Sequence, residues 1–489
     1  MSHPNEDEME DAPELLDADD ALEEVNDAEG DVAMDSDDEQ EELTLQNDSI
    51  AYFDAHKDSV FAIAQHPTLP SLIATGGSEG EGDDAPGKGY VFDTSPVVGR
   101  PVLPASYNAD PSAQPPKSFE LQPLFTIEGH TDSINALAFT YPRGEFLVSG
   151  GMDGRMRAYA LAVDAHNKPS FKFLAEAQEV EEINWLAPCP SETYANAIAL
   201  GASDGSVWVY TVDPSDASNP LSLVQSYFLH TASCTAGAWS PDGRFLATVS
   251  EDSSLNVWDV WGEAGAKGLT NDNGQTVVSL TGADQRFEVE GGLYAVAIDP
   301  KTSFVAVGGA GGAIKIVGLP RLGVDAQPVS SKQSKSKAKG ADAGGSQGGA
   351  ILADLHTQGD GIETLSFSPT NPLLAAGSVD GSICVYDTSR RFAVRRNIKE
   401  AHEGHSIVKV EFIRGLGEGW LFTSCGMDGA VRRWDVRGAA GTKESSMTKE
   451  WKGHRGDGEG GGVLGFVQGN TGERIITAGD DSVVLVFEA

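Results

Sequence analysis

Basic residues are scarce in this chain of 489 residues, which has 34 Lys and Arg against 74 Asp and Glu. Residues 1–46 hold 20 of the acidic residues and contain no Lys or Arg. A protein that binds nucleic-acid phosphates needs clustered basic side chains. The one close cluster, Lys332, Lys335, Lys337 and Lys339, lies in a Ser-, Gly- and Ala-rich stretch that is typical of a flexible insert. We therefore expect no direct contact with nucleic acid and predict a basic protein segment as the partner.

Cysteines and long apolar runs are also few. The four cysteines, Cys189, Cys234, Cys384 and Cys425, have no close spacing that would indicate a metal site or a redox pair. No run of about 18 apolar residues indicates a membrane span, and the acidic start differs from a secretory signal. We expect a monomer without cofactor or membrane contact, with reduced cysteines. The expected compartment is the cytoplasm, with the nucleus as the alternative.

The acidic segment 1–46 has the composition of a disordered tail, because it contains too little apolar surface to offset the entropy of ordering the chain. It could act as a solubilising tail, it could compete with RNA for a basic client, or it could shield the binding face until a client arrives. Ser36 precedes the acidic run Asp37–Glu39 and resembles an acidophilic kinase site. The composition alone leaves these roles open.

From residue 47 onward the chain repeats one pattern of short alternating strands and tight turns. In six units an Asp in a turn is followed six positions later by an aromatic residue: Asp153 and Tyr159, Asp204 and Tyr210, Asp252 and Trp258, Asp380 and Tyr386, Asp428 and Trp434, and Asp481 and Phe487. Two less regular units have Phe92 or Val317 at the aromatic position. The units resemble WD repeats, so we predict an all-β chain folded as a single closed eight-bladed WD40 β-propeller.

The last unit stops after its third strand, and a spare strand candidate, 49–53, precedes the first complete unit. Pairing this strand with the final blade would close the ring and remove an exposed sheet edge. The predicted organisation is an acidic disordered tail at 1–46 and a propeller at 47–489. Four flexible inserts rich in Pro, Gly, Ser and Ala are expected at about 94–122, 262–285, 319–349 and 437–448.

Several units contain a His, a Ser or Thr and an Asp that together look like catalytic triads. These are His130 with Ser149 and Asp153, His230 with Thr248 and Asp252, and His402 or His405 with Ser424 and Asp428. In WD repeats such side chains form a hydrogen-bonded stack with a Trp, here Trp258 and Trp434, inside each blade. A set that recurs from blade to blade is explained by architecture. We therefore predict structural stacks and no enzyme activity.

The resemblance to WD repeats also indicates which residues surround the top of the central channel. Carried onto this chain, the ring positions hold Phe61, Met152, Glu179, Glu181, Glu251, Tyr294, Glu363, Met427 and Asp480, and the nearby loops add Asp58, Asp132, Glu182 and Asp360. In blade three this prediction takes Val180, between Glu179 and Glu181, as the first apolar residue of the inner strand. No Lys or Arg holds a ring position. This composition predicts a site for an Arg- and Lys-rich peptide with an apolar or aromatic anchor. The alternative is that the acidic residues only keep the face soluble.

The stretch NDSIAYFDAHKDSVFAIAQHP at 47–67, which follows the acidic segment, and IEGHTDSINALAF at 127–139 carry a more specific resemblance. They resemble the Sqt-type ribosome-assembly factors of fungi and the related angio-associated migratory cell protein of animals. The resemblance implies a dedicated chaperone that captures the basic N-terminal segment of one large-subunit ribosomal protein on its top face and supports assembly of the large (60S) subunit. Histones are equally basic, so a general scaffold, such as a histone-binding propeller or a ubiquitin-ligase or signalling adaptor, remains the alternative.

Overall fold

The computed structural model describes residues 47–80, 82, 85–97, 119–166, 168–322, 348–415, 419–438, 446–456 and 461–489. The predicted tail at 1–46 and most of the predicted insert at 319–349 lie outside these residues. No helix in the described ranges is long and apolar enough to cross a membrane.

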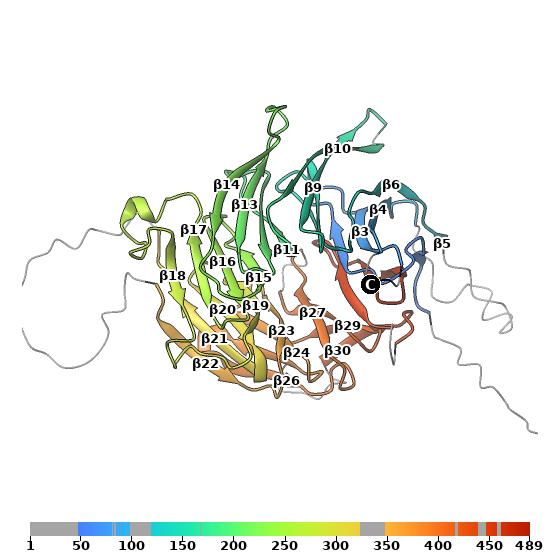
Figure 1. Ribbon diagram of the computed structural model, residues 1–489. Helices are drawn as coiled ribbons and strands as arrows, with labels where there is room; N and C mark the ends of the chain where they lie inside the picture. Colours follow the sequence, from blue (N-terminus) through green and yellow to red (C-terminus); the bar gives the residue numbers. More distant parts are fainter. Residues whose placement is uncertain are drawn as a thin grey trace, which may run out of the picture. The chain divides into compact units, whose positions relative to one another are not determined.

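Residues 47–489 form eight antiparallel blades, which confirms the predicted eight-bladed propeller (Figure 1). Each blade has four antiparallel strands. From the innermost strand outward, blade one consists of β2 (Ala62–Gln65), β3 (Leu72–Ser78), β4 (Gly87–Asp93) and β6 (Pro123–Ile127), and blade two of β7 (Ile134–Phe139), β8 (Phe146–Gly151), β9 (Arg155–Val163) and β10 (Pro169–Gln178). Blade three consists of β11 (Ile183–Pro188), β12 (Ala197–Ala202), β13 (Val207–Val212) and β14 (Leu221–Tyr227), and blade four of β15 (Cys234–Trp239), β16 (Phe245–Ser250), β17 (Leu255–Asp259) and β18 (Thr276–Leu280).

The second half of the ring repeats this order. Blade five consists of β19 (Leu293–Ile298), β20 (Phe304–Gly309), β21 (Ala313–Gly318) and β22 (Ile351–His356), and blade six of β23 (Ile362–Phe367), β24 (Leu373–Ser378), β25 (Ile383–Asp387) and β26 (Ala393–Ile398). Blade seven consists of β27 (Ile407–Phe412), β28 (Leu421–Gly426), β29 (Val431–Asp435) and β30 (Met447–Trp451), and blade eight of β31 (Val463–Val467), β32 (Arg474–Gly479), β33 (Val484–Glu488) and β1 (Ala51–Phe53). Within the described ranges, three short 3-10 helices lie in connections: Gly265–Lys267, Ala310–Gly312 and Thr388–Arg390.

The core lies between neighbouring blades, where apolar side chains of one sheet pack on those of the next. One such cluster joins Val148 and Met156 of blade two to Ile183 and Leu200 of blade three, all of them buried. Each inner strand contacts the inner strand of the next blade, and β31 of blade eight contacts β2 of blade one. The ring is therefore closed.

The closing strand comes from the N-terminal side of the propeller. β1 pairs antiparallel with β33, with Ala51 opposite Val486 and Phe53 opposite Val484. The ring of Phe53 is almost fully buried and stacks on Phe92 with centroids 4.8 Å apart. A further two-residue strand, β5 (Phe119–Glu120), pairs in parallel with β1 and gives blade eight a fifth strand, which the sequence did not predict.

The predicted insert at 262–285 is wrong in extent. It contains the helix Gly265–Lys267 and the whole of β18, the fourth strand of blade four. Thr276, Val277 and Val278 are buried in this strand, which explains why it pairs with β17 instead of forming a loop. Residues 281–285 follow β18 and so lie at the opposite end of the blade from residues 262–275. Similarly, β30 begins inside the predicted insert at 437–448.

Candidate peptide-binding face

In blades two to eight, the two kinds of loop at one end of the blade are held together by one repeated hydrogen bond. The residue before the turn between the second and third strands donates its N–H to the carbonyl of the residue before the inner strand. This pairing is found for Met152 with Ser133 (2.9 Å), Glu251 with Ser233 (3.1 Å), Val379 with Gly361 (2.9 Å), Met427 with Ser406 (2.9 Å) and Asp480 with Gly462 (2.9 Å). We call this end the top. The repeated bond places Met152, Glu251, Met427 and Asp480, all predicted site residues, at equivalent positions in their blades.

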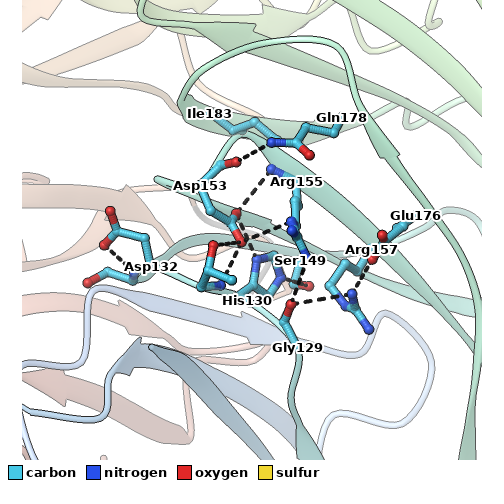
Figure 2. Close-up of polar contacts among 12 residues, drawn as sticks. Gly129, His130, Asp132, Ser149, Asp153, Arg155, Arg157, Glu176, Gln178 and Ile183 are labelled. Atoms are coloured by element: carbon cyan, nitrogen blue, oxygen red, sulfur yellow. Dashed lines mark hydrogen bonds and ion pairs between the residues drawn. The ribbon is translucent and has the colours of Figure 1, made fainter. Parts of the chain in front are cut away.

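The structure brings the predicted blade stacks together. In blade two, His130 contacts Asp153 through Nδ1 (3.1 Å) and Ser149 through Nε2 (2.8 Å), and Asp153 also accepts from the N–H of Thr131 (Figure 2). Burial opposes ionisation of Asp153, but hydrogen bonds from His130 and Thr131 outweigh it and lower its pKa. The side chain of His130 is fully buried, so this set ties two loops to a strand and has no access to a substrate.

Blade seven has the same stack and resolves an alternative that the sequence left open. His402, and not His405, lies within 2.8 Å of Asp428 and 2.7 Å of Ser424, and Trp434 donates its indole N–H to Ser424 (2.8 Å). A further stack, which sequence reasoning missed, joins His454 to Asp481 (2.9 Å) and Thr477 (2.7 Å) in blade eight.

Blade four departs from the predicted stack. His230 contacts Thr248 through Nε2 at 2.8 Å, and Trp258 donates to the same hydroxyl at 2.8 Å. Ser254 stands between His230 and Asp252, because its hydroxyl lies 2.6 Å from His230 Nδ1 while the nearest carboxylate oxygen of Asp252 is 4.0 Å away. Burial lowers the pKa of His230 to about 4. A buried neutral His that bonds two hydroxyls is a structural element.

The predicted position of the ring residues in blade three is wrong by three residues. The N–H of Ser203 bonds to the carbonyl of Glu182 (3.2 Å), so Glu182 occupies the place that Ser133 holds in blade two. The inner strand begins at Ile183, whereas the prediction took Val180 as its first apolar residue. Glu179 and Glu181 therefore lie in the loop before the ring position, and not on the ring.

Three predicted acidic residues shape the loops that carry them. Asp58, Asp132 and Asp360 each accept the backbone N–H of the following residue, at 2.8, 2.6 and 2.7 Å. Asp480 accepts a hydrogen bond from the hydroxyl of Ser59 (2.5 Å), which connects the tops of blades eight and one. These carboxylates keep lone pairs for a ligand, since each uses only part of its hydrogen-bonding capacity.

A group of acidic residues without cationic partners among the described residues lies over blades four to six. Tyr294 is half-buried, and its pKa is raised by burial and by the charges of Glu251 and Glu363 on the neighbouring blades. The pKa of Glu363 is itself raised, first by burial and then by Asp360. Among the described residues no Lys or Arg forms an ion pair with Glu251 or Glu363. We call Glu251, Tyr294 and Glu363 the acidic arc.

One glycine fixes the position of Glu251 in this arc. Gly292 has φ +90°, and a Cβ there would lie 2.7 Å from the Cα of Glu251. Only glycine allows this backbone conformation and this close approach without strain.

Apolar side chains complete the top face. Phe61 and Met152 are each 42% exposed, while Met427 is half-buried against the backbone of Gly462. The nearby Lys57 is paired with Glu79 at 2.7 Å, and Lys88 approaches the same carboxylate at 3.3 Å. Glu79 was not among the predicted residues, and its two cationic partners compensate its negative charge. In the described ranges no group of three His, Cys, Asp or Glu side chains could hold a metal ion.

Comparisons with known proteins agree with this architecture. The family described as WD domain, G-beta repeat, matches residues 121–159, 221–259 and 350–387. The chain is 29% identical to ribosome assembly protein SQT1 of Saccharomyces cerevisiae, over 94% of this chain and 90% of the yeast protein. It is 22% identical to the human angio-associated migratory cell protein, over 90% of this chain and 80% of the human protein.

Two solved structures are also similar. The crystal structure of Chaetomium thermophilum Sqt1 bound to the N-terminus of the ribosomal protein L10 is 61% identical, with a TM-score of 0.78, over 91% of this chain and 100% of that one. The crystal structure of S. cerevisiae Sqt1 is 26% identical, with a TM-score of 0.66 and the same coverage of both chains.

Proposed function

This chain belongs to the Sqt1 family of ribosome assembly proteins, and we propose that it is a chaperone that binds the basic N-terminal segment of the large-subunit ribosomal protein L10 on its top face. Captured in this way, the client is kept from RNA and from aggregation until it joins the large subunit. Capture takes place in the cytoplasm, where ribosomal proteins are synthesised.

The acidic arc is the observation that carries this proposal. Glu251 and Glu363 flank Tyr294, whose pKa is raised first by burial and then by the negative charges of these two residues. A Lys or Arg side chain placed there would relieve this repulsion and form charge-assisted hydrogen bonds. Tyr294 adds an aromatic surface whose hydroxyl is already engaged with the carbonyl of Gly291 at 2.8 Å. The arc therefore suits a cationic peptide with an apolar contact.

We infer that the protein acts by binding alone. The sets that resemble catalytic triads recur in blades two, seven and eight, and the His side chain is fully buried in each. A catalytic group must reach its substrate. A role in holding the loops together accounts for these residues without any reaction.

Co-purification tests the proposal directly. The tagged full-length chain and its Glu251→Lys/Glu363→Lys variant would be isolated from cells, and bound proteins quantified. We expect L10 to be the ribosomal protein most enriched with the unmodified chain and to be lost from the variant. Enrichment of histones in place of L10, or equal recovery of L10 with both chains, would contradict the proposal.

A further inference from the structure

An exposed aromatic surface lies at the top of blade three, away from the ring positions. Phe228 follows β14 directly and is 65% exposed, the highest value for a large apolar side chain in the described ranges. Leu229, the next residue, is 40% exposed. The ring of Phe228 meets Trp208 edge to face at 5.7 Å, and Trp208 lies nearly parallel to Tyr210 at 6.5 Å. We call these four residues the aromatic ledge.

Acidic side chains lie beside this ledge. Glu179 and Glu181 occupy the loop that leads from blade two into blade three, and both are exposed. β10 ends one residue before Glu179 and contacts β14, which ends one residue before Phe228. The pKa of Tyr210 is raised by burial and by the charge of Glu179, in agreement with this arrangement. No Lys or Arg of the described ranges forms an ion pair with Glu179 or Glu181. The exposed ring of Phe228 and carboxylates without an ion-pair partner are thus combined in one place.

Blade two shows what such a combination binds. The ring of Phe173 is 43% exposed, and the guanidinium of Arg157 lies over it at 4.5 Å from the centroid. The same guanidinium pairs with the carboxylate of Glu176 (Figure 2). Here an aromatic ring and a carboxylate together hold an arginine. The ledge of blade three has the ring and the carboxylate, but among the described residues no cationic side chain lies over Phe228 or Trp208.

We propose that the aromatic ledge and Glu179 bind an arginine side chain of the client, beyond the part of the client that contacts the acidic arc. This inference rests on the proposed function, because the arginine belongs to the same basic segment. A planar guanidinium stacks on an aromatic face and still pairs with a carboxylate, whereas a lysine ammonium is more strongly hydrated and stacks less well. The ledge would therefore select arginine over lysine, which the acidic arc alone does not do.

Calorimetric titration of the full-length chain tests the inference with two probes: the L10 N-terminal peptide, and the same peptide with every arginine replaced by lysine. We expect the unmodified chain to bind the first peptide about three- to tenfold more tightly. Phe228→Leu keeps an apolar side chain but removes the ring, and it should abolish this preference by weakening only the arginine peptide. Glu179→Gln should weaken both peptides.

Phe173→Leu is the matched control, because that ring already holds Arg157; it should leave both affinities unchanged. Phe228 is largely exposed, so its substitution should leave the melting temperature unchanged. Equal binding of the arginine peptide by the unmodified chain and by Phe228→Leu would overturn the ledge while leaving the proposed function intact. If the unmodified chain bound neither peptide, the proposed function would fail, and this inference with it.

Discussion

Two glutamates on inner strands, one at each end of the propeller, have opposite electrostatic environments. Glu363 lies at the top, where burial and the neighbouring Asp360 raise its pKa. Glu411 lies at the bottom, where the cations Lys409 and Arg414 overcome the effect of burial and lower its pKa. Lys409 is 2.9 Å from the carboxylate of Glu411. The surroundings thus disfavour the charged form of a glutamate at the top and favour it at the bottom.

This difference extends over the two ends. At the bottom, Arg244 pairs with Glu263 at 3.3 Å, and a cavity of about 930 Å³ is lined by both basic and acidic side chains, among them Arg414, Arg474 and Glu473. At the top, Glu251 and Glu363 have no cationic partner among the described residues. The net charge of the chain is therefore a poor guide to where it binds. What distinguishes the acidic arc is that two carboxylates without a cationic partner among the described residues act on one aromatic side chain.

The largest expected effect is a loss of stability when the strand that closes the ring is weakened. Phe53→Ala removes a buried ring that stacks on Phe92, and should lower the free energy of unfolding by about 3–5 kcal/mol. Urea denaturation measures this loss. Deleting only residues 1–46 removes no described strand and should leave stability unchanged. If both changes were equally harmless, β1 would not be needed for closure.

Reversing charge in the acidic arc should have the next largest effect. In Glu251→Lys/Glu363→Lys, attraction for a basic peptide becomes repulsion, and the L10 N-terminal peptide should bind about 3 kcal/mol more weakly, or more than about a hundredfold. Calorimetry at low and moderate salt measures the change. Glu192→Lys is the control, because Glu192 is exposed at the bottom, in the loop between β11 and β12; it should change affinity by no more than a few tenths of a kcal/mol. If Glu192→Lys lost as much peptide affinity as the double variant, the difference between the two ends would be contradicted.

Truncating the aromatic centre of the arc should be somewhat milder. Tyr294→Ala should cost about 1–3 kcal/mol of peptide affinity if the ring packs on the client, since buried aromatic anchors dominate such interfaces. Phe61→Ala tests the corresponding ring of blade one in the same way. Both side chains are at least partly exposed, so circular dichroism melting should be nearly unaffected. Unchanged affinity in both variants would show that the face binds by charge alone.

The smallest expected effect is a change in the free energy of unfolding that has opposite signs for the glutamates at the two ends. Because the pKa of Glu363 is raised in the folded chain, its ionised form opposes folding, so Glu363→Gln should raise the free energy of unfolding at pH 7 by a few tenths of a kcal/mol. This gain should vanish as the pH falls below the ordinary value of 4.5 and the native carboxyl becomes protonated.

Glu411→Gln should instead lower the free energy of unfolding at pH 7, by about 1 kcal/mol. Its folded pKa is lowered, so the stabilisation is present above 4.5 and is lost as the pH falls below that value. Urea unfolding of both variants at pH 7 and in acid measures the two signs. The same sign in both variants at pH 7 would contradict the electrostatic difference between the ends.

The fold could be predicted because each blade repeats one turn. The Asp in that turn orients two loops through a buried His, as Asp153 does with His130, and an aromatic residue follows at a fixed distance. The irregular fifth blade still forms its ladder, with Gly311 at φ +62° in place of the Asp and a buried Val317 in place of the aromatic residue. Repetition identifies a blade even when single positions differ.

Features without repetition could not be predicted in this way. In blade three, Val180 is followed by two acidic residues and then by Ile183, so two apolar residues compete for the start of one strand. Strand β5 has only two residues and no alternating pattern, and its pairing depends on contacts far away in the sequence. The hydroxyl of Ser254 comes between His230 and Asp252 through side-chain geometry that spacing does not reveal. The acidic arc could not be predicted because the sequence does not show which acidic side chains lack a cationic partner.

The pairing of β1 with β33 has a consequence for how this chain is made. Ala51 pairs with Val486, which lies far away in the sequence, so the contact that completes the ring cannot form until synthesis has passed β33. Such long sequence separations make folding slow. A product shortened by even the final strand would leave β1 and the outer edge of blade eight unpaired, exposed to proteases and to aggregation. The closed ring, and with it the complete top face, can therefore form only after β33 has been synthesised.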